Sequence, residues 1–130
     1  MSHNEVLTQS DADQLVNRFG AFGDGQVSKL VMSWVPDRRC RVELLGRDQF
    51  HDWRPTRVHF DIYPAEKLFW LPAWQGSIQC GEVAILAEGG LYCLAVVLSR
   101  DYCRTIDEVS VESTSFFVIG RHMEYSLASL

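Results

Sequence analysis

The most apolar stretch of the chain covers residues 83–98, with the sequence VAILAEGGLYCLAVVL. Gly89 and Gly90 divide it, and because glycine adopts positive φ freely, the pair predicts a two-residue β-hairpin turn. In that register Glu88 faces Leu91 and Val83 faces Val96. Both faces of the hairpin are then apolar, whereas a half-exposed hairpin alternates apolar with polar residues. We therefore expect the hairpin to form the centre of a sheet, with its second face covered by a curled sheet or by a second copy of the chain.

One helix is predicted near the N-terminus. From Ser10 onward, apolar residues recur at helical spacing, at Ala12, Leu15, Val16 and Phe19, and polar residues occupy the other side. Ser10 is the expected N-cap and Gly20 the expected stop. The pattern predicts one amphipathic helix that lies on a sheet, preceded by a loose tail at residues 1–8.

Strand patterns fill most of the remaining chain. Residues 39–45 and 56–63 alternate cleanly, and their predicted inward positions are Cys40, Val42, Leu44, Val58, Phe60 and Ile62. Other strands are expected at residues 26–35, 67–71 and 116–125, with brief ones at 77–80 and 109–112. Residues 46–55 are expected to form a loop, and residues 64–66 separate the alternating strand from the short apolar one. Because the gaps are too short for helical crossovers, the strands should pair antiparallel.

The predicted fold is therefore α+β and β-dominated. It consists of a twisted antiparallel sheet of seven or eight strands with one N-terminal helix packed on it. The 130 residues have the length of one domain, so a single domain over residues 1–130 is expected.

Charge and composition narrow the class of partner. The chain has 12 Lys and Arg residues against 17 Asp and Glu residues, a net charge of −5. This balance argues against binding to nucleic acid or to an anionic membrane, because both surfaces are held by clustered Lys and Arg. No segment approaches the ~20 consecutive apolar residues of a transmembrane helix, and the polar N-terminal segment lacks the pattern of a signal peptide. These features predict a cytoplasmic protein.

The cysteines are widely spaced, at Cys40, Cys80, Cys93 and Cys103, with no C-x-x-C pair. In a reducing compartment they are best interpreted as small buried hydrophobic residues. A disulfide framework is the less favoured alternative.

His59 and Asp61 are the first candidates for a polar site. They are two residues apart on a predicted strand, so both side chains leave the same face. That spacing suits an oriented imidazole or part of a metal site, and His51 and Asp52 in the preceding loop would bring two more ligands if they lay nearby. A solvated strand face has the same pattern, and no recognised ligand set is present. We therefore expect a solvent-facing row, with no metal and no cofactor.

Asp24 is a further candidate because it lies between Gly23 and Gly25, after the predicted helix. A carboxylate at such a corner can contact a cation or a partner. Asp-Gly is also a common turn signal, in which the aspartate caps the turn and the glycines supply positive φ. We favour the turn.

Trp53, Trp70 and Trp74 lie in segments where a buried face is hard to assign. Exposed tryptophans beside polar residues are typical of binding hot spots, although Phe69 and Trp70 would also serve as a lid on the sheet core. Nucleophile and phosphate-loop signatures are absent from the sequence. The tryptophans therefore favour a binding surface over a catalytic site.

Two stretches resemble a known family when taken together. They are RFGAFGDGQV at residues 18–27 and FFVIGRHMEY at residues 116–125, with the acidic-Gly-Gly hairpin and the alternating strand of residues 58–62 in the expected order between them. The family comprises small bacterial domains of unknown function with an aromatic-His-Asp-Gly corner, and it is similar to some immunity proteins of polymorphic-toxin systems. Gly23 stands where the family has its histidine, so any catalytic or metal role of that histidine would be missing here. The resemblance implies a fold and a bacterial cytosolic setting.

The leading functional hypothesis is a non-enzymatic protein-binding module, of the immunity type if the resemblance holds, that acts through a surface including Trp53, Trp70 or Trp74. One alternative is a small enzyme, or a ligand- or metal-binding protein, built on Asp24, His51, Asp52, His59 and Asp61. A third is a homo-oligomer that associates through a sheet edge or through the second face of the hairpin.

Overall fold

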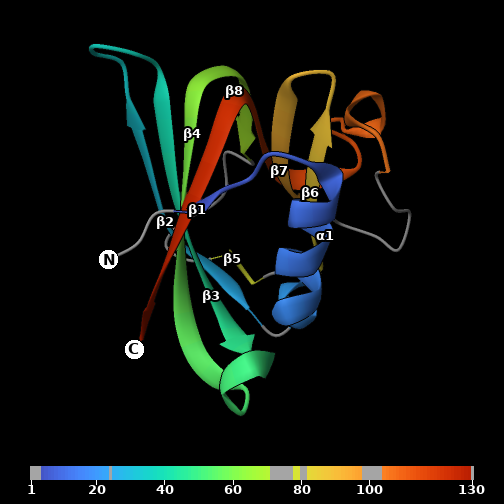
Figure 1. Cartoon of the computed structure of the whole chain (residues 1–130). Coiled ribbons are helices and arrows are strands. Elements are labelled where there is room, and N and C mark those ends of the chain that lie inside the picture. The colour runs from blue at the N-terminus through green and yellow to red at the C-terminus, as the bar shows by residue number, and fades with distance from the viewer. Residues whose placement is uncertain (1–3, 24, 71–77, 80–81, 98–103, 130) are drawn as a thin grey trace.

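The computed structural model describes residues 4–23, 25–70, 78–79, 82–97 and 104–129 (Figure 1). The first half of the chain forms β1 (Asn4–Glu5), α1 (Gln9–Arg18), η1 (Gly20–Phe22), β2 (Gln26–Ser33), β3 (Arg39–Asp48), η2 (Gln49–His51) and β4 (Arg54–Trp70). The second half forms β5 (Ile78–Gln79), β6 (Glu82–Glu88), β7 (Leu91–Val97), η3 (Ile106–Glu108) and β8 (Thr114–Ser129).

The strands form one antiparallel sheet in the order β5-β2-β3-β4-β8-β7-β6, with β1 paired to β8. The prediction of a β-dominated α+β fold with one N-terminal helix is confirmed. The middle of the sheet is the long β4–β8 pair, which runs from Thr56 opposite Ser129 to Trp70 opposite Phe116. In Figure 1 the strands β2, β3, β4 and β8 cross one another in projection, because the sheet twists strongly along them. Within the described ranges, no helix has the length and apolar character needed to cross a bilayer.

The β6–β7 hairpin has the predicted turn but a different place in the sheet. Gly89 and Gly90 have φ values of 58° and 78°, and Val83 pairs with Val96 as Glu88 does with Leu91, so the turn and the register are confirmed. The predicted central position is wrong, because β6 ends the described strand order. A hairpin with apolar residues on both faces is stable when both faces are buried. Other segments of the chain can bury them, so the hairpin does not need further strands on both sides.

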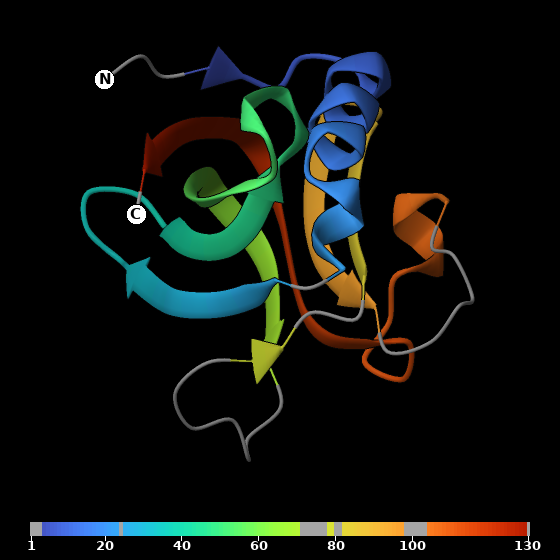
Figure 2. The same cartoon turned by 90° about the horizontal axis from the view of Figure 1, so that it is seen from below.

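Each face of this hairpin belongs to its own buried cluster. In the main core, Ile85 and Leu94 share a cluster with the helix residues Ala12 and Leu15. On the other face the buried residues are Leu86, Cys93, Ala95, Phe117 and Ile119, with Ile106 and Val109 from the η3 segment packed against them. Figure 2 shows α1 lying along the hairpin, with η3 on a different side of it. The second face is therefore covered by the chain itself, and residues 109–112, predicted as a strand, form part of this covering segment without strand structure.

Residues 4–8 are ordered, which corrects the expectation of a loose tail. Asn4 of β1 pairs with Tyr125, and Val6 is 1% exposed. Thr8 is the helix N-cap: its hydroxyl accepts from the Asp11 N–H at 3.2 Å, and the Asp11 carboxylate accepts from the Thr8 N–H at 3.1 Å. This capping box satisfies two otherwise free backbone donors, so the helix begins before Ser10, the predicted N-cap.

The corner between α1 and β2 uses its glycines differently from the prediction. Positive φ occurs at Gly20, Ala21 and Phe22, whereas Gly23 has helical angles of φ −58° and ψ −32°. Gly25 is needed for space, because a Cβ there would lie 2.2 Å from the carbonyl oxygen of Leu45. Asp24 itself lies outside the described residues.

The strand β4 continues through residues 64–66, which were expected to separate two strands. A bulge between Ala65 and Lys67 interrupts its pairing with β8, and the pairing resumes at Lys67 opposite Ile119. The strands predicted at residues 56–63 and 67–71 are therefore one. The loop predicted at residues 46–55 is shorter than expected, because β3 extends to Asp48 and β4 begins at Arg54.

The two edges of the sheet differ. At β6, the Gln9 side chain donates to the Ile85 carbonyl at 3.0 Å and accepts from the Ala87 N–H at 2.8 Å. The Gln9 side-chain amide thus makes two hydrogen bonds with β6 that a neighbouring strand would otherwise make. At the other edge, β5 pairs only with Gln26 and Val27, and no described residue pairs with the outer side of β2 from residue 29 to residue 33.

Candidate functional site

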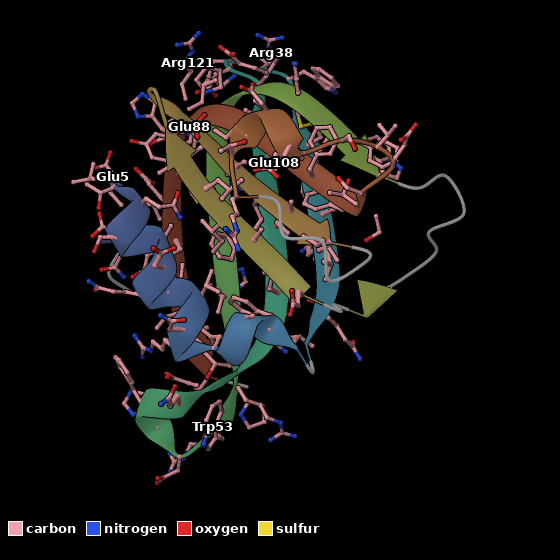
Figure 3. All side chains as sticks on the ribbon, turned by 90° about the vertical axis from the view of Figure 1, so that its right-hand side faces the viewer. Glu5, Arg38, Trp53, Glu88, Glu108 and Arg121 are labelled. Atoms are coloured by element: carbon pink, nitrogen blue, oxygen red, sulfur yellow. The ribbon has the colours of Figure 1, made fainter. Side chains whose placement is uncertain are left out.

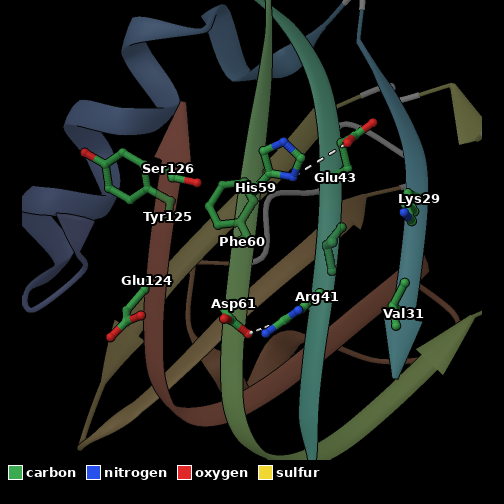
Figure 4. Close-up of a pocket in the computed structure, with 11 residues that line it drawn as sticks. Lys29, Val31, Arg41, Glu43, His59, Phe60, Asp61, Glu124, Tyr125 and Ser126 are labelled. Carbon is green, nitrogen blue, oxygen red and sulfur yellow. Dashed lines mark ion pairs between the residues drawn. The ribbon is translucent and has the colours of Figure 1, made fainter. Parts of the chain in front are cut away.

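Polar side chains gather on the face of β2, β3, β4 and β8 that is opposite the main core. The strand register forms two rows across this face, Lys29-Glu43-His59-Ser126 and Val31-Arg41-Asp61-Glu124. Residues two apart on a strand share a face, so the rows are neighbours. Together with Phe60 and Tyr125 they line a groove of about 520 Å³ (Figure 4).

The charged side chains of this groove hold one another in place. Arg39 Nη1 donates to Asp61 Oδ2 at 3.0 Å, and Arg41 Nε lies 3.7 Å from Asp61 Oδ1. Glu43 accepts a hydrogen bond from the Ser28 hydroxyl at 2.6 Å, and its carboxylate lies 3.6 Å from Nδ1 of His59. Glu43 and Asp61 are therefore each held by contacts with neighbouring side chains on this face of the sheet.

Tyr63 extends this polar network beyond the groove. Its hydroxyl donates to Glu124 Oε1 at 2.7 Å, and this hydrogen bond, followed by burial, raises the pKa of Tyr63 to about 12. The Arg39 guanidinium lies 4.0 Å from the centre of the Tyr63 ring, and the His122 ring stacks on it with 5.5 Å between centroids. Tyr63 therefore stays protonated at neutral pH and serves as a donor.

The groove offers groups for recognition. His59 and Lys29 present an imidazole and an ammonium, and Ser126 a hydroxyl. Cys40 is buried on the other face, where burial raises its pKa to about 12, and a thiol with so high a pKa is a poor nucleophile. Among the residues that the structure describes, no group of three or more His, Cys, Asp and Glu side chains is placed to hold a metal ion.

The structure brings together two of the four predicted polar residues. His59 and Asp61 both line the groove. His51 and Asp52 lie in the connection between β3 and β4, and His51 lines a different depression, near the start of β4 and the end of β8. The alternation of the strand predicted that His59 and Asp61 share a face. It carries no information on the direction in which the β3–β4 connection, with His51 and Asp52, leaves the sheet.

The β3–β4 connection is built on a buried ion pair between the helix and the sheet. Asp48, with its side chain 2% exposed, accepts from Arg18 Nε at 2.8 Å and from Arg18 Nη2 at 2.7 Å. It also accepts from the Phe50 N–H at 2.9 Å, and the Arg18 guanidinium lies 4.7 Å from the centre of the Phe50 ring. The hydrogen bond from Arg18 is the main cause that lowers the pKa of Asp48. This arrangement fixes the connection on the end of α1.

The tryptophans predicted as one binding surface lie apart where they are described. Trp53 is 50% exposed and Trp70 is 46% exposed, but they stand at opposite ends of β4. Trp53 also lies against the helix end, because a Cβ at Gly20 would be 3.7 Å from its ring. Trp74, like Asp24, is outside the described residues. Trp53 and Trp70 therefore do not form a common patch.

The sequence analysis missed the most exposed tryptophan of the described chain. Trp34 is 67% exposed and its neighbour Val35 is 82% exposed. They lie in the β2–β3 connection, which projects away from α1 at the upper left of Figure 1, whereas Figure 3 shows Trp53 at the opposite end of the molecule from Arg38 of this connection. The sequence signal was Pro36-Asp37, a pair of turn residues that directly follows Val35 and indicates that the strand ends shortly before it.

Compared with protein-family models, curated protein sequences and solved structures, the chain matches no family model and no curated sequence or solved structure. The resemblance of residues 18–27 and 116–125 to a bacterial domain family therefore stays an expectation. The function has to be argued from the surfaces of this chain.

Proposed function

We propose that this chain is a protein-binding module whose contact surface includes the connection between β2 and β3. The observation that carries the proposal is the exposure of Trp34 and Val35, 67% and 82%. A hairpin turn needs neither side chain for its backbone geometry, and a tryptophan in water leaves a large apolar area unburied. Tryptophan is also enriched among the residues that dominate binding energies at protein interfaces.

The neighbouring part of β2 supports the same surface. Val31 is 42% exposed and lies on the groove side of the strand. Val31, Trp34 and Val35 are thus three exposed apolar residues at one end of β2, close to the polar rows of the groove. Interfaces commonly combine apolar residues with a polar rim. An immunity-type protein would be one form of such a module, and that form rests on the resemblance alone.

Photo-crosslinking tests this proposal. With benzoylphenylalanine in place of Trp34 in the full chain, expressed in its source cells, we expect a discrete covalent adduct with a partner protein. The purified partner should bind a Trp34→Ala variant about 30-fold more weakly than the original chain, which is the effect of losing a hot spot of about 2 kcal/mol.

Trp53→Ala is the comparison variant, since Trp53 is half exposed at the opposite end of the molecule. It should keep the affinity of the original chain. Adducts that form from position 53 and not from position 34, or equal binding by Trp34→Ala, would place the contact elsewhere and reject this surface.

The groove favours a second candidate function, the binding of a small polar ligand, because it joins His59 and Asp61 in one cavity. Two-dimensional NMR with a panel of amino acids, carboxylic acids and sugars should find a compound that shifts the His59 ring resonances and saturates. Its binding should be lost in His59→Ala and kept in His51→Ala, since His51 lines a different depression. Binding that survives His59→Ala, or no binding by any member of the panel, would remove this candidate.

A further inference from the structure

We propose that the cleft between α1, β1 and η2 is a binding site for an uncharged saccharide, whose ring packs on Phe50 and whose hydroxyl groups bond to side-chain amides. The cleft measures about 580 Å³, within the range of about 300–1,000 Å³ that small-molecule sites span. Trp34 and His59 do not line it. The inference therefore goes beyond the proposed protein-binding function and does not depend on it.

Segments far apart in the sequence form the walls of this cleft. One wall is α1, another is β1, which pairs with β8, and η2 lies near the last turn of the helix. Figure 2 shows η2 projecting between β1 and α1, and in Figure 3 Glu5 of β1 lies near the start of the helix. Leu15 and Tyr125, buried and partly buried against the main core, form an apolar floor.

Phe50 gives the cleft an aromatic surface that is held in position. It is 70% exposed, its N–H donates to Asp48 Oδ1 at 2.9 Å, and the Arg18 guanidinium lies 4.7 Å from the centre of its ring. The face of an aromatic ring carries partial negative charge, so it attracts the weakly positive C–H groups on the flat side of a sugar ring. An exposed phenyl ring fixed in this way is suited to stacking against a saccharide.

Side-chain amides line the same cleft and supply polar contacts. They belong to Asn4, Gln14, Asn17 and Gln49. An amide offers both donors and an acceptor, and a sugar hydroxyl both donates and accepts, so the two groups can pair in either direction. Gln14 makes one long contact, to the Ser10 hydroxyl at 3.5 Å, and the other three side chains make no hydrogen bond with a described residue. These amides are therefore available to a ligand.

The charged groups of the cleft favour an uncharged ligand. Arg18 is committed to Asp48 through hydrogen bonds of 2.8 and 2.7 Å. The Asp11 carboxylate holds the start of the helix, because its Oδ2 accepts from two backbone N–H groups at 3.0 and 3.1 Å. Glu5 is then the one charged side chain of the described lining that no described residue engages, and its carboxylate can accept from sugar hydroxyls. An anion would find no free cation here.

NMR titration of the full chain tests the inference, with glucose, galactose, mannose, xylose, N-acetylglucosamine, maltose and cellobiose as the probes. At least one should shift the side-chain NH₂ resonances of Asn4, Asn17 and Gln49 together and reach saturation. A panel in which no sugar shifts them, or in which sugars shift only the His59 groove, would overturn the inference. So would spermidine that shifts them when no sugar does, because the ligand would then be a cation.

Phe50→Ala is the main variant, because it removes the aromatic surface and keeps the backbone N–H that bonds to Asp48. It should bind the sugar about tenfold more weakly than the original chain, the effect of losing one aromatic contact. Phe50→Tyr, which keeps the ring, should bind as the original chain does. Trp53→Ala is the matched control, since Trp53 is half exposed in the same connection and does not line the cleft.

Gln49→Ala tests the amides without changing the aromatic ring. Gln49 is exposed, so its replacement should leave the fold intact and weaken sugar binding about fivefold, the effect of losing one hydrogen bond. Equal binding by Phe50→Ala and Trp53→Ala, or unchanged binding by Gln49→Ala, would show that the sugar does not occupy this cleft and would overturn the inference.

Discussion

Replacing Gly25 by Ala is expected to destabilise the folded chain by about 3 kcal/mol, the upper end of the usual cost of overpacking. The added Cβ would lie 2.2 Å from the carbonyl oxygen of Leu45 and 3.1 Å from that of Phe22. Both oxygens belong to the backbone, which cannot move aside as a flexible side chain does. Either β3 must move away from the corner or the corner must open, and both changes disturb the packing of buried Phe22. Urea unfolding followed by tryptophan fluorescence measures the loss.

Gly23→Ala is the control in the same corner. Gly23 has helical backbone angles, and its Cβ would meet only the Gly20 carbonyl oxygen, at an ordinary 3.6 Å. An alanine that fits without strain reduces the conformational entropy of the unfolded chain, so this variant should be as stable as the original or more stable by about 0.5 kcal/mol. Equal stability of the Gly25 and Gly23 variants would contradict the close approach at Gly25.

Replacing Asp48 by Asn is expected to destabilise the chain by about 3 kcal/mol, which is typical of breaking a buried ion pair by removing one charge. The amide keeps the shape of the carboxylate and can still accept from the Phe50 N–H. It cannot accept both hydrogen bonds from Arg18, whose guanidinium is 20% exposed and keeps its charge. Asp52→Asn is the matched control in the same connection, because Asp52 is exposed and its left-handed backbone suits asparagine.

The ion pair of Asp48 also makes the free energy of unfolding depend on pH. Arg18 lowers the pKa of Asp48 in the folded state below its ordinary value of 3.8, so folding favours the charged carboxylate. The stabilisation is complete above about pH 5, where the unfolded chain is also ionised, and is lost as the pH falls through the lower folded pKa. The difference in unfolding free energy between the original chain and Asp48→Asn should therefore shrink from pH 6 to pH 2. A difference that stays constant over this range would show that the charge of Asp48 is not what stabilises the connection.

Local sequence signals predicted the parts of the fold that depend on neighbouring residues. The Gly89-Gly90 turn sets the β6–β7 register by itself, because a two-residue hairpin admits one pairing. Alternation likewise placed His59 and Asp61 on one face. The position of β6 at an edge was not predictable in this way, since it depends on which distant segments cover the hairpin. Thr8 was missed as N-cap although Asp11, three residues later, completes its capping box, because Ser10 lies nearer the apolar stripe and is also a favoured N-cap residue.

The candidate site was only partly predictable for the same reason. The row that joins Glu43 to His59 and Ser126 depends on the register among β3, β4 and β8, and no pattern within a single strand contains it. The exposure of Trp34 was not predicted, although a turn follows it closely. The strand was expected to run from residue 26 to residue 35, whereas β2 ends at Ser33, so Trp34 lies in the connection beyond the sheet.

The side-chain amide of Gln9 protects the β6 edge of the sheet. It occupies the carbonyl of Ile85 and the N–H of Ala87, two backbone groups that a further strand would need for pairing. An unprotected sheet edge is a template for pairing with another chain, so a residue of the N-terminal helix helps to prevent association of this molecule through β6.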